Sequence, residues 1–227
     1  MKAKLVEAID LAPGIRHLSF ETGGEPLDFA PGQFVSLKES LNGSEYTRAY
    51  SLASAPDSNR FDLCLNLVPG GAFSAYLFTL KPGAEVELMP PLGFFTLRHP
   101  DRDAVMIATG TGIAPFRSML HAHLRNIKAH VTLLFGTRYE ESVLYGNEFQ
   151  EFERQHPNFQ FWPTLTRPTE NWKDRTGRVQ SHLDEALAGR TDLDVYLCGL
   201  KEMVDDVRGV LKAKGYDRKQ IIYEKYD

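Results

Sequence analysis

The sequence contains very little cysteine. Among its 227 residues only Cys64 and Cys198 occur, far apart and in no Cys-x-x-Cys pair. Closely spaced cysteines are what a cysteine-built zinc site, an iron–sulfur cluster or a disulfide framework requires. We therefore expect no metal site and no disulfide framework, so any redox chemistry of this chain needs an added organic cofactor.

An excess of basic charge is also lacking, as is a long hydrophobic run. The 26 Lys and Arg residues stand against 30 Asp and Glu residues, and the formal net charge of −4 gives no overall basic field for a nucleic-acid backbone. Glu7, Asp10 and Pro13 interrupt the apolar residues at the N-terminus, which therefore lacks the pattern of a secretory signal or a membrane-spanning helix. We expect a cytoplasmic protein with no nucleic-acid partner and no membrane insertion.

What the sequence does contain is a change of pattern near residues 98–102. Before it, β-like runs are separated by turn-forming pairs such as Pro31-Gly32, Asn42-Gly43 and Pro82-Gly83. This spacing predicts an antiparallel barrel or sandwich with one helix at residues 72–80. The expected strands span residues 4–9, 15–21, 33–38, 49–52, 60–68 and 85–89.

After His99-Pro100, short apolar runs alternate with helical segments. Such alternation predicts a parallel sheet with helices on both faces. The expected strands span residues 104–108, 131–135, 159–165 and 194–198, with a terminal strand at 221–226, and the expected helices span 115–126, 147–154, 179–187 and 202–214. We therefore divide the chain into two domains, residues 1–99 and 100–227.

A glycine-rich turn opens the second half. The segment GTGIAP (110–115) follows the first predicted strand and leads into a helix, a geometry in which backbone N–H groups can hold a pyrophosphate. It differs from the Rossmann fingerprint, because Pro115 replaces the third glycine and residues 131–138 contain no acid for the ribose. The next predicted strand ends instead in a cation, Arg138. On these residues alone the turn is either a phosphate site or only a tight turn.

Two segments of the first half carry chemistry of a similar kind. In RAYSLAS (48–54), Arg48 and Tyr50 share one face of a predicted strand, while Ser51 faces the other side unless the strand ends there. In GGAFS (70–74), a glycine-rich turn enters the predicted helix, which again suits an anion. Taken alone, the first segment is more typical of an ordinary edge strand, and the second is equally typical of a plain helix start.

Read together, these segments resemble a known family. The order RAYSLAS (48–54), GGAFS (70–74), GTGIAP (110–115), LCGLKEM (197–203) and IYEKYD (222–227) is similar to that of the ferredoxin–NADP(H) reductase family, across essentially the whole chain. The resemblance implies a β domain followed by an α/β domain: an N-terminal antiparallel β-barrel that binds FAD, then a parallel-sheet domain that binds the nucleotide. Without a cysteine-rich region, the chain resembles a minimal two-domain member.

The resemblance also implies which residues of the first domain hold FAD. Arg48 would pair with the pyrophosphate, Tyr50 would stack on the isoalloxazine ring, and Ser51 would form a hydrogen bond near flavin N5. The second phosphate segment comprises Gly71, Ala72, Phe73 and Ser74. The strand whose backbone lies along the edge of the flavin ring comprises Leu65, Asn66 and Leu67.

In the second domain the resemblance implies a site for a nicotinamide dinucleotide. The residues of its phosphate loop are Gly110, Thr111, Gly112 and Pro115, and those beside the nicotinamide are Cys198, Gly199 and Met203. A 2′-phosphate pocket of NADP(H) would comprise Thr166, Arg167, Arg175 and Arg178, and Arg138 at the end of the second strand of this half is a further candidate for cofactor binding. Glu224 and Tyr226 would cover the flavin and close the nicotinamide site, although Asp227 follows the aromatic residue here.

Each of these residues also has a plainer interpretation. Cys198 at a strand end is commonly a small buried hydrophobic residue, Glu224 would otherwise be a solvated charge, and Arg167 would otherwise cap a loop before Pro168. The resemblance favours the functional interpretation, in which Ser51, Cys198, Glu224 and Tyr226 shape the reaction site.

The function that follows is hydride transfer between NADP(H), in preference to NADH, and bound FAD. Electrons would then pass between the flavin and a one-electron carrier such as ferredoxin, flavodoxin or another redox protein. Two alternatives stay open at this point. One is an NAD(P)H-dependent flavin reductase that releases reduced flavin, and the other is a non-catalytic subunit that only binds a dinucleotide.

Overall fold

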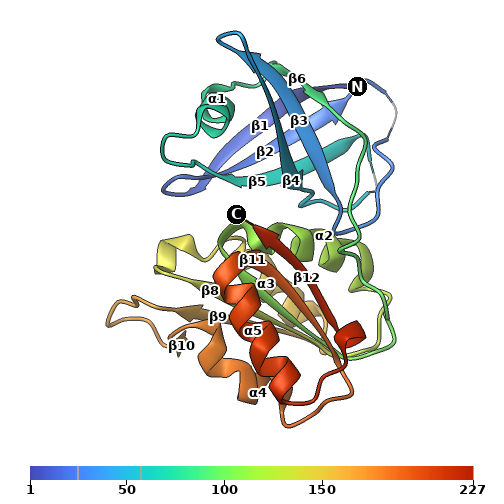
Figure 1. The fold of residues 1–227 in the computed structure, drawn as a ribbon, viewed down its shortest axis with the longest axis vertical. Coiled ribbons are helices and arrows are strands. Elements are labelled where there is room, and N and C mark those ends of the chain that lie inside the picture. Colours follow the sequence, from blue (N-terminus) through green and yellow to red (C-terminus); the bar gives the residue numbers. More distant parts are fainter. Residues whose placement is uncertain (25, 57, 227) are drawn as a thin grey trace. The chain divides into compact units, whose positions relative to one another are not determined.

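The computed structural model describes residues 1–24, 26–56 and 58–226. The chain forms two units, each with its own sheet: Met1–Leu97 with Ala114–Ala122, and Arg98–Ile113 with His123–Asp227 (Figure 1). The helix α2 (Ala114–His123) thus packs with the first unit, although in the sequence it follows the first strand of the second.

The first unit is an antiparallel barrel with the strand order β4-β3-β6-β1-β2-β5. Its strands are β1 (Lys2–Ala12), β2 (Ile15–Thr22), β3 (Phe34–Leu41), β4 (Ser44–Ser51), β5 (Arg60–Asn66) and β6 (Glu85–Leu88), with α1 (Ala72–Thr79) between the last two. A bridge between Leu52 and Leu63, and a 2.8 Å hydrogen bond from Ala53 N to Asp62 O, join the two ends of this order. The expected antiparallel domain is therefore confirmed as a closed barrel.

Alternate residues of the strands fill the barrel, because successive side chains of a strand point to opposite faces. In β5, Phe61, Leu63 and Leu65 are no more than 2% exposed. The ring of Phe61 stacks on that of Phe20 from β2, with centroids 5.4 Å apart. The period-two apolar pattern that predicted these strands is thus the pattern of the core.

The hairpin of β3 and β4 is longer than its apolar residues indicate. The sequence predicts a strand only at residues 49–52, whereas β4 begins at Ser44. Asn42 and Gly43 both have positive φ values, 51° and 79°, as in a two-residue turn whose twist matches an antiparallel hairpin. Most residues of β4 before Ser51 are exposed and polar, so the turn rather than the apolar pattern sets the start of this strand.

The second unit contains a sheet whose strands are all parallel, in the order β10-β9-β8-β7-β11-β12. These strands are β7 (Ala104–Thr109), β8 (Val131–Thr137), β9 (Phe159–Leu165), β10 (Arg175–Thr176), β11 (Asp194–Leu200) and β12 (Ile221–Tyr226). The helical segments are η1 (Gly110–Ile113), η2 (Glu140–Ser142), α3 (Gly146–Gln155), η3 (Val179–His182), α4 (Leu183–Leu187), α5 (Lys201–Ala213) and η4 (Arg218–Gln220). The expected parallel α/β domain is confirmed.

Helices cover both faces of this sheet (Figure 1). Apolar residues of α4 and α5, such as Leu187 and Val207, share one buried cluster with Val195 of β11. On the other face, Phe149 of α3 packs against Phe161 of β9, with ring centroids 5.2 Å apart. The strand order reverses between β7 and β11, and open α/β sheets bind ligands outside the carboxyl ends of the strands at such a switch point.

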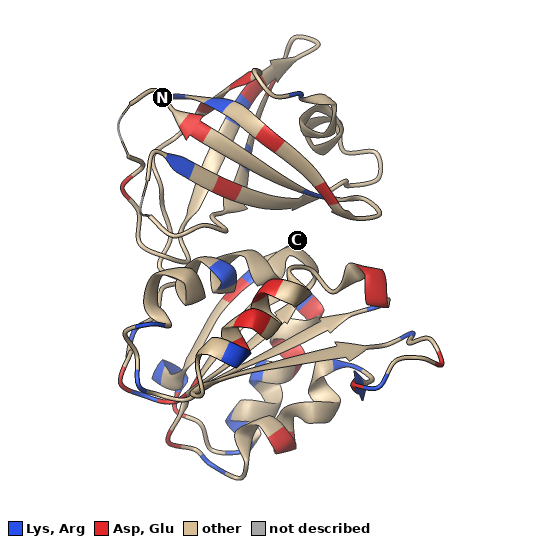
Figure 2. Cartoon of the chain, turned by 180° about the vertical axis from the view of Figure 1, so that it is seen from behind, with Lys and Arg blue, Asp and Glu red and all other residues tan. Residues whose placement is uncertain are grey.

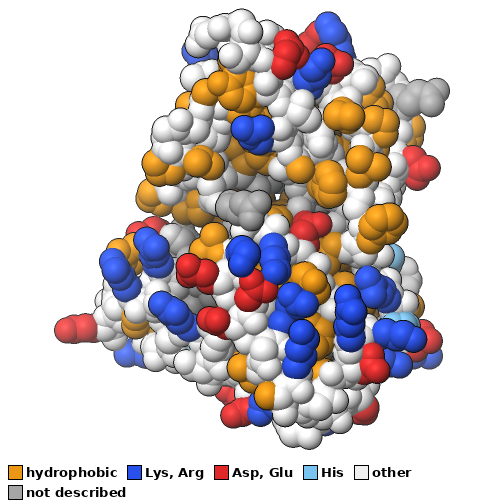
Figure 3. Space-filling view, in the orientation of Figure 1, with side chains coloured by type: hydrophobic (Ala, Val, Ile, Leu, Met, Phe, Trp, Pro, Cys, Tyr) orange, Lys and Arg blue, Asp and Glu red, His pale blue; other side chains and the backbone are white. Residues whose placement is uncertain are grey.

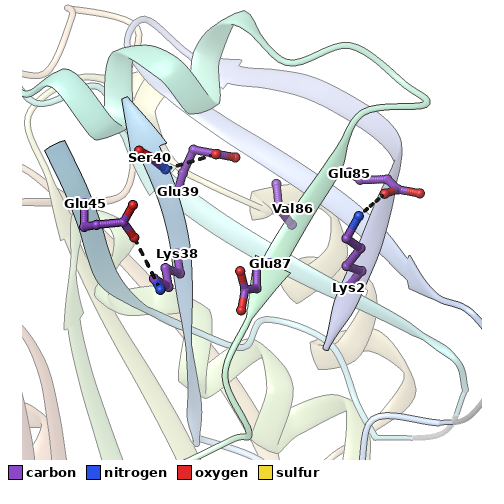
Figure 4. Close-up of a pocket in the computed structure, with 8 residues that line it drawn as sticks. All are labelled: Lys2, Lys38, Glu39, Ser40, Glu45, Glu85, Val86 and Glu87. Atoms are coloured by element: carbon purple, nitrogen blue, oxygen red, sulfur yellow. Dashed lines mark hydrogen bonds and ion pairs between the residues drawn. The ribbon is translucent and has the colours of Figure 1, made fainter. Parts of the chain in front are cut away.

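A polar hollow of about 360 Å³ lies on the outer surface of the barrel (Figure 4). Glu87 of β6 is paired in register with Lys38 of β3 and with Lys2 of β1. Lys38 also lies 3.3 Å from Glu45 of β4, and Lys2 lies 3.1 Å from Glu85, which is on β6 like Glu87. The charges therefore alternate across four neighbouring strands, as on a solvated sheet face. None of the residues singled out from the sequence lines this hollow, so it is not the functional site.

Charges of both signs are spread over both units (Figure 2). On one face of the second unit, Lys and Arg side chains gather around α5 (Figure 3). Asp205 offsets part of this charge, since its carboxylate lies 3.0 Å from Lys201 Nζ and 2.6 Å from Lys225 Nζ. Hydrogen bonds from Lys225 and Lys201 lower the pKa of Asp205 to about 2.

In the described part of the chain, no helix combines the length and the apolar character needed to cross a membrane.

The barrel core gives a first test of the fold. We expect Phe61→Ala to lower the free energy of unfolding by about 3–5 kcal/mol, because a fully buried aromatic ring and its stacking on Phe20 are lost. The matched control is Phe94→Ala in the same unit, where the side chain is 89% exposed and the expected change is within about 0.5 kcal/mol. Urea unfolding of the three proteins measures both values, and equal losses would contradict this account of the core.

Candidate functional site

Three side chains of β4 project from one face of the strand: Tyr46, Arg48 and Tyr50. Arg48 is exposed, with its guanidinium carbon 5.8 Å from the centre of the Tyr46 ring. Burial raises the pKa of Tyr50 to about 12, although the charge of Arg48 acts in the opposite direction. This face therefore presents an exposed guanidinium between two aromatic rings, of which Tyr50 stays a neutral phenol.

The N-terminus of α1 forms the next part of the site. Gly71 precedes the helix and supplies no side-chain cap, so the N–H groups of the first turn lack helical partners. Ser74 Oγ donates to Gly71 O at 3.1 Å and accepts from Val68 N at 3.0 Å. The hydroxyl of Ser74 thus holds the turn in shape, and the backbone N–H groups remain for an anion.

The Phe73 ring joins these two parts. It packs against Tyr46 and Tyr50 with centroid distances of 6.1 and 6.3 Å and interplanar angles of 18° and 21°. The structure therefore brings the β4 face and residues 71–74 together, as the sequence analysis expected of a pyrophosphate site. Tyr46 was not singled out from the sequence, although its position two residues before Arg48 places it on the same face.

The remaining residues of the first unit lie at strand ends. Ser51, the last residue of β4, is 6% exposed and opposite Phe34 in the ladder. Leu65 is buried in β5, and Asn66 is the exposed last residue of that strand. Leu67, which follows β5, is 43% exposed and donates its N–H to Gly14 O at 2.8 Å.

In the second unit, the loop η1 packs directly on the end of β11. A Cβ on Gly112 would lie 2.6 Å from Cys198 C and would overlap its carbonyl oxygen. Gly199 has a φ of 144°, and a Cβ there would overlap Thr109 Oγ1. Both positions therefore need glycine, and the ends of β7 and β11 come together at the switch point of the sheet.

This close approach leaves a polar atom without a partner. Thr109 Oγ1 is buried and has no hydrogen-bond partner among residues 1–24, 26–56 and 58–226. Buried hydroxyls in folded proteins are usually hydrogen-bonded, so an orphaned one beside a glycine-lined loop fits a polar group of a bound ligand. Thr109 was not singled out from the sequence, where its only signal is a hydroxyl at the end of a predicted strand.

Cys198 lies in contact with the terminal strand. In the parallel ladder Cys198 is paired with Glu224, two residues before Tyr226. Burial raises the pKa of the Cys198 thiol well above its usual value, and the charge of Glu224 raises it further, while a hydrogen bond with the Tyr226 side chain has the opposite effect. The structure therefore assembles Cys198, Glu224 and Tyr226, with sulfur as a protonated thiol at neutral pH.

Two other expected residues of the second unit border this place. Thr111 in η1 is buried. Met203 in the first turn of α5 is 7% exposed, and its Cε would lie 3.2 Å from a Cβ on Gly199. Pro115, the second residue of α2, is buried in the first unit, so the second unit brings together the other predicted phosphate-loop and nicotinamide residues.

The basic residues expected around the 2′-phosphate are arranged in two groups. Beyond the ends of β8 and β9, Thr166 N donates to Thr137 O at 3.0 Å and Arg167 N donates to Arg138 O at 2.9 Å. These bonds place the two exposed arginines side by side. Arg167 Nη1 also donates to Tyr139 Oη at 3.0 Å, an aromatic contact that the sequence analysis did not identify.

Arg175 belongs to a different environment. Its guanidinium carbon lies 3.7 Å from the centre of the Trp162 ring, and its Nη2 lies 2.5 Å from Glu185 Oε1. The hydrogen bond from Arg175 lowers the pKa of Glu185. Arg178 is exposed at the start of η3, and in the described part of the chain neither it nor Arg138 forms an ion pair. Arg138, Arg167 and Arg178 are therefore better placed than Arg175 to receive an anion.

Among the described residues, no group of three or more His, Cys, Asp or Glu side chains is arranged to hold a metal ion.

Comparison with known families accounts for this arrangement. The model of the oxidoreductase FAD-binding domain matches residues 2–97, and that of the oxidoreductase NAD-binding domain matches residues 106–209. Ferredoxin–NADP reductase B of Sorangium cellulosum is 43% identical over 238 residues, an alignment that covers 100% of this chain and 97% of that protein. The chain belongs to the ferredoxin–NADP reductase family.

Other relatives of this reductase are longer than it is. The toluate 1,2-dioxygenase electron transfer component of Pseudomonas putida is 32% identical over 202 residues, covering 88% of this chain and 59% of that protein. The crystal structure of the cytochrome P450 reductase GcoB from Amycolatopsis matches with a TM-score of 0.89 at 31% identity, covering 99% of this chain and 69% of that one. The chain thus spans about three fifths to two thirds of the length of such relatives.

The family and the structure together confirm the expected fold class, the FAD and the nicotinamide dinucleotide. The reductase is a flavoprotein oxidoreductase, which excludes the alternative of a non-catalytic subunit. Hydride passes between the dinucleotide and FAD, and the reductase exchanges electrons with a redox-protein partner.

The raised pKa of Cys198 predicts a pH dependence of stability. The thiol of the unfolded chain ionises near its usual pKa of about 8.5 and the folded thiol does not, so the free energy of unfolding falls as the pH rises above that value. We expect this loss to be about 1 kcal/mol smaller in Cys198→Ala than in the wild type between pH 8.5 and 9.5.

Urea unfolding at a series of pH values measures this difference. Cys64 is present in both proteins, so its titration cancels in the comparison. Identical slopes in the two proteins would show that the Cys198 thiol ionises in the folded state as readily as in the unfolded state.

Proposed function

We propose that this reductase transfers hydride from NADPH to FAD and passes electrons singly to ferredoxin. The observation that carries the proposal is the junction of β7 and β11. There, two glycines and Thr109 Oγ1, which has no hydrogen-bond partner among the described residues, lie next to Cys198 and Glu224. The similarity to ferredoxin–NADP reductase B of Sorangium cellulosum, a protein of nearly the same length, supports NADPH as the nucleotide and ferredoxin as the partner.

We assign FAD to residues 1–99. Arg48 is the partner of the pyrophosphate, because a guanidinium forms strong multi-donor bonds to phosphate, and the first-turn N–H groups of α1 complete that site. Tyr50 would offer its neutral ring to the isoalloxazine, and Ser51 would form a hydrogen bond near flavin N5. Bound flavin supplies the ability to accept a hydride and to release electrons one at a time.

We assign the dinucleotide to residues 100–227. The loop 110–113 would hold the pyrophosphate, and Cys198 and Gly199 would lie beside the nicotinamide. Because the Cys198 thiol stays protonated, the carboxylate of Glu224 is the group in this trio that can accept and return a proton. Tyr226 holds the thiol through its hydrogen bond, and Cys198 and Glu224 together orient the ring for transfer.

The arginines beyond β8 and β9 favour NADPH over NADH. A phosphate monoester carries about −1.5 to −2 charge at neutral pH and is well matched by guanidinium groups. Arg167 and Arg138 are held side by side by the backbone, with Tyr139 supporting the first of them. The later arginine Arg178 is the third member of this pocket, and Arg175 stays with Glu185 and Trp162.

The visible spectrum of the purified protein, followed by anaerobic addition of NADPH, tests the function. We expect a yellow protein that keeps its flavin through gel filtration, is bleached by NADPH and then reduces ferredoxin. Loss of flavin on the column, with NADPH oxidation restored by free flavin, would support a flavin reductase instead. Replacing ferredoxin by flavodoxin in the same assay shows which of the two carriers the reductase reduces faster. The cytoplasmic location stays a prediction.

The nucleotide preference gives a separate prediction. We expect the wild type to favour NADPH in kcat/KM, and Arg167→Ala to lower the NADPH/NADH ratio about 10-fold or more, because the loss of a charge-assisted phosphate contact costs about 1.5–3 kcal/mol. Arg154→Ala is the matched control, since Arg154 is an exposed arginine of α3 paired with Glu151. A wild type that prefers NADH, or equal ratios in both variants, would refute the assigned pocket.

A further inference from the structure

The helix α2 is anchored in the first unit by apolar and polar contacts. Phe116 is fully buried and packs edge-on against Phe95, with ring centroids 5.5 Å apart. Met119 and Leu120 are also no more than 2% exposed. This burial fixes the helix on the barrel side, although its N-terminus continues directly from the loop η1.

Two polar side chains of α2 hold the segment that follows Ser51. Arg117 Nη1 donates to Ala53 O at 2.8 Å, and Ser118 Oγ donates to Ser54 O at 2.6 Å. The Ser118 residue is fully buried, and the side chain of Arg117 is 14% exposed. Hydrogen bonds of this length to consecutive carbonyl groups restrict the backbone of the segment directly.

The same segment is fixed from β5. Arg117 Nη1 lies 3.0 Å from Asp62 Oδ2, and Asp62 Oδ1 accepts a 2.7 Å hydrogen bond from Ser19 Oγ. The backbone N–H of Asp62 in turn donates to Ser54 Oγ at 3.0 Å. The Asp62 carboxylate thus bonds to Arg117 of α2 and to Ser19 of β2, while the Asp62 backbone bonds to Ala53 and Ser54, so several bonds fix the same segment.

We propose that Arg117 and Ser118 are positioning residues for hydride transfer. They hold the carbonyl groups of Ala53 and Ser54 against α2 within the first unit. The serine expected at flavin N5, Ser51, therefore lies directly before a segment that two side chains of one helix keep in place. Hydride transfer depends on such placement, because a displacement of 1 Å can cost about 100-fold in rate. The inference rests on the proposed function of the two cofactor sites.

The test measures flavin reduction by stopped flow in the FAD-loaded enzyme at saturating NADPH. We expect Arg117→Met to slow hydride transfer about 10-fold and Ser118→Ala to slow it about 3-fold. The FAD content and the NADPH concentration for half-maximal rate should change less than about 2-fold in both. Arg117→Lys, which keeps the charge and one donor, should recover part of the rate.

Arg16→Met is the matched control. Arg16 also joins a carbonyl group and a carboxylate in the first unit, since its Nη1 donates to Phe78 O at 2.5 Å and its Nε lies 2.6 Å from Asp10 Oδ1. Its partners do not belong to the Ser51 segment, so we expect lower thermal stability with an unchanged hydride-transfer rate.

The outcomes separate the inference from the function on which it rests. A wild type that NADPH does not reduce would overturn the proposed function. A wild type that is reduced normally, with an unchanged rate in Arg117→Met or an equal loss in Arg16→Met, would overturn the positioning role alone. If Arg117→Met does not fold, Ser118→Ala decides: a slower rate at normal flavin content supports the role, and an unchanged rate refutes it.

Discussion

The close approach of two backbones at the junction of β7 and β11 is the constraint on which the second unit depends. Gly112 lies so near the carbonyl group of Cys198 that no side chain fits there. Gly199 likewise lies so near Thr109 that it leaves no room for a side chain. This contact brings the loop 110–113, the thiol of Cys198 and the carboxylate of Glu224 close together. A larger residue at either glycine would move the loop off the end of the sheet, and the groups around it would separate.

In the first unit, hydrogen bonds and an ion pair around Asp62 hold separate segments of the chain together. The barrel closes where Leu52 meets Leu63, and the residues just beyond that closure bond to Asp62 and to Arg117. The place where the sheet closes is therefore also the place where α2 is attached. The largely buried carboxylate of Asp62 is compensated by the guanidinium of Arg117. Removal of either side chain would leave the other charge without its partner. Closure of the barrel and retention of the helix are thus coupled.

Local patterns in the sequence predicted the two sheets and most of their strands, and several of the residues singled out from the sequence lie close together in each unit. The patterns were insufficient wherever an element is defined by partners distant in the sequence. The first part of β4 is polar and exposed, so only its turn indicates it. The two residues of β10 exist only as partners of β9. No periodicity shows that α2 packs with the barrel or that Arg175 is paired with Glu185. Nor does any periodicity show that Thr109 Oγ1 lacks a partner within the part of the chain that the structure describes.

The protonated state of Cys198 bears on how long such an enzyme stays active. Reduced flavins react with oxygen and generate peroxide, and peroxide attacks the thiolate form of cysteine on the way to sulfenic and sulfinic acids. A thiol that is fully buried, and whose pKa is raised by burial and by Glu224, offers almost no thiolate to that attack. The burial that packs the sulfur against the terminal strand therefore also protects it from oxidative damage during turnover.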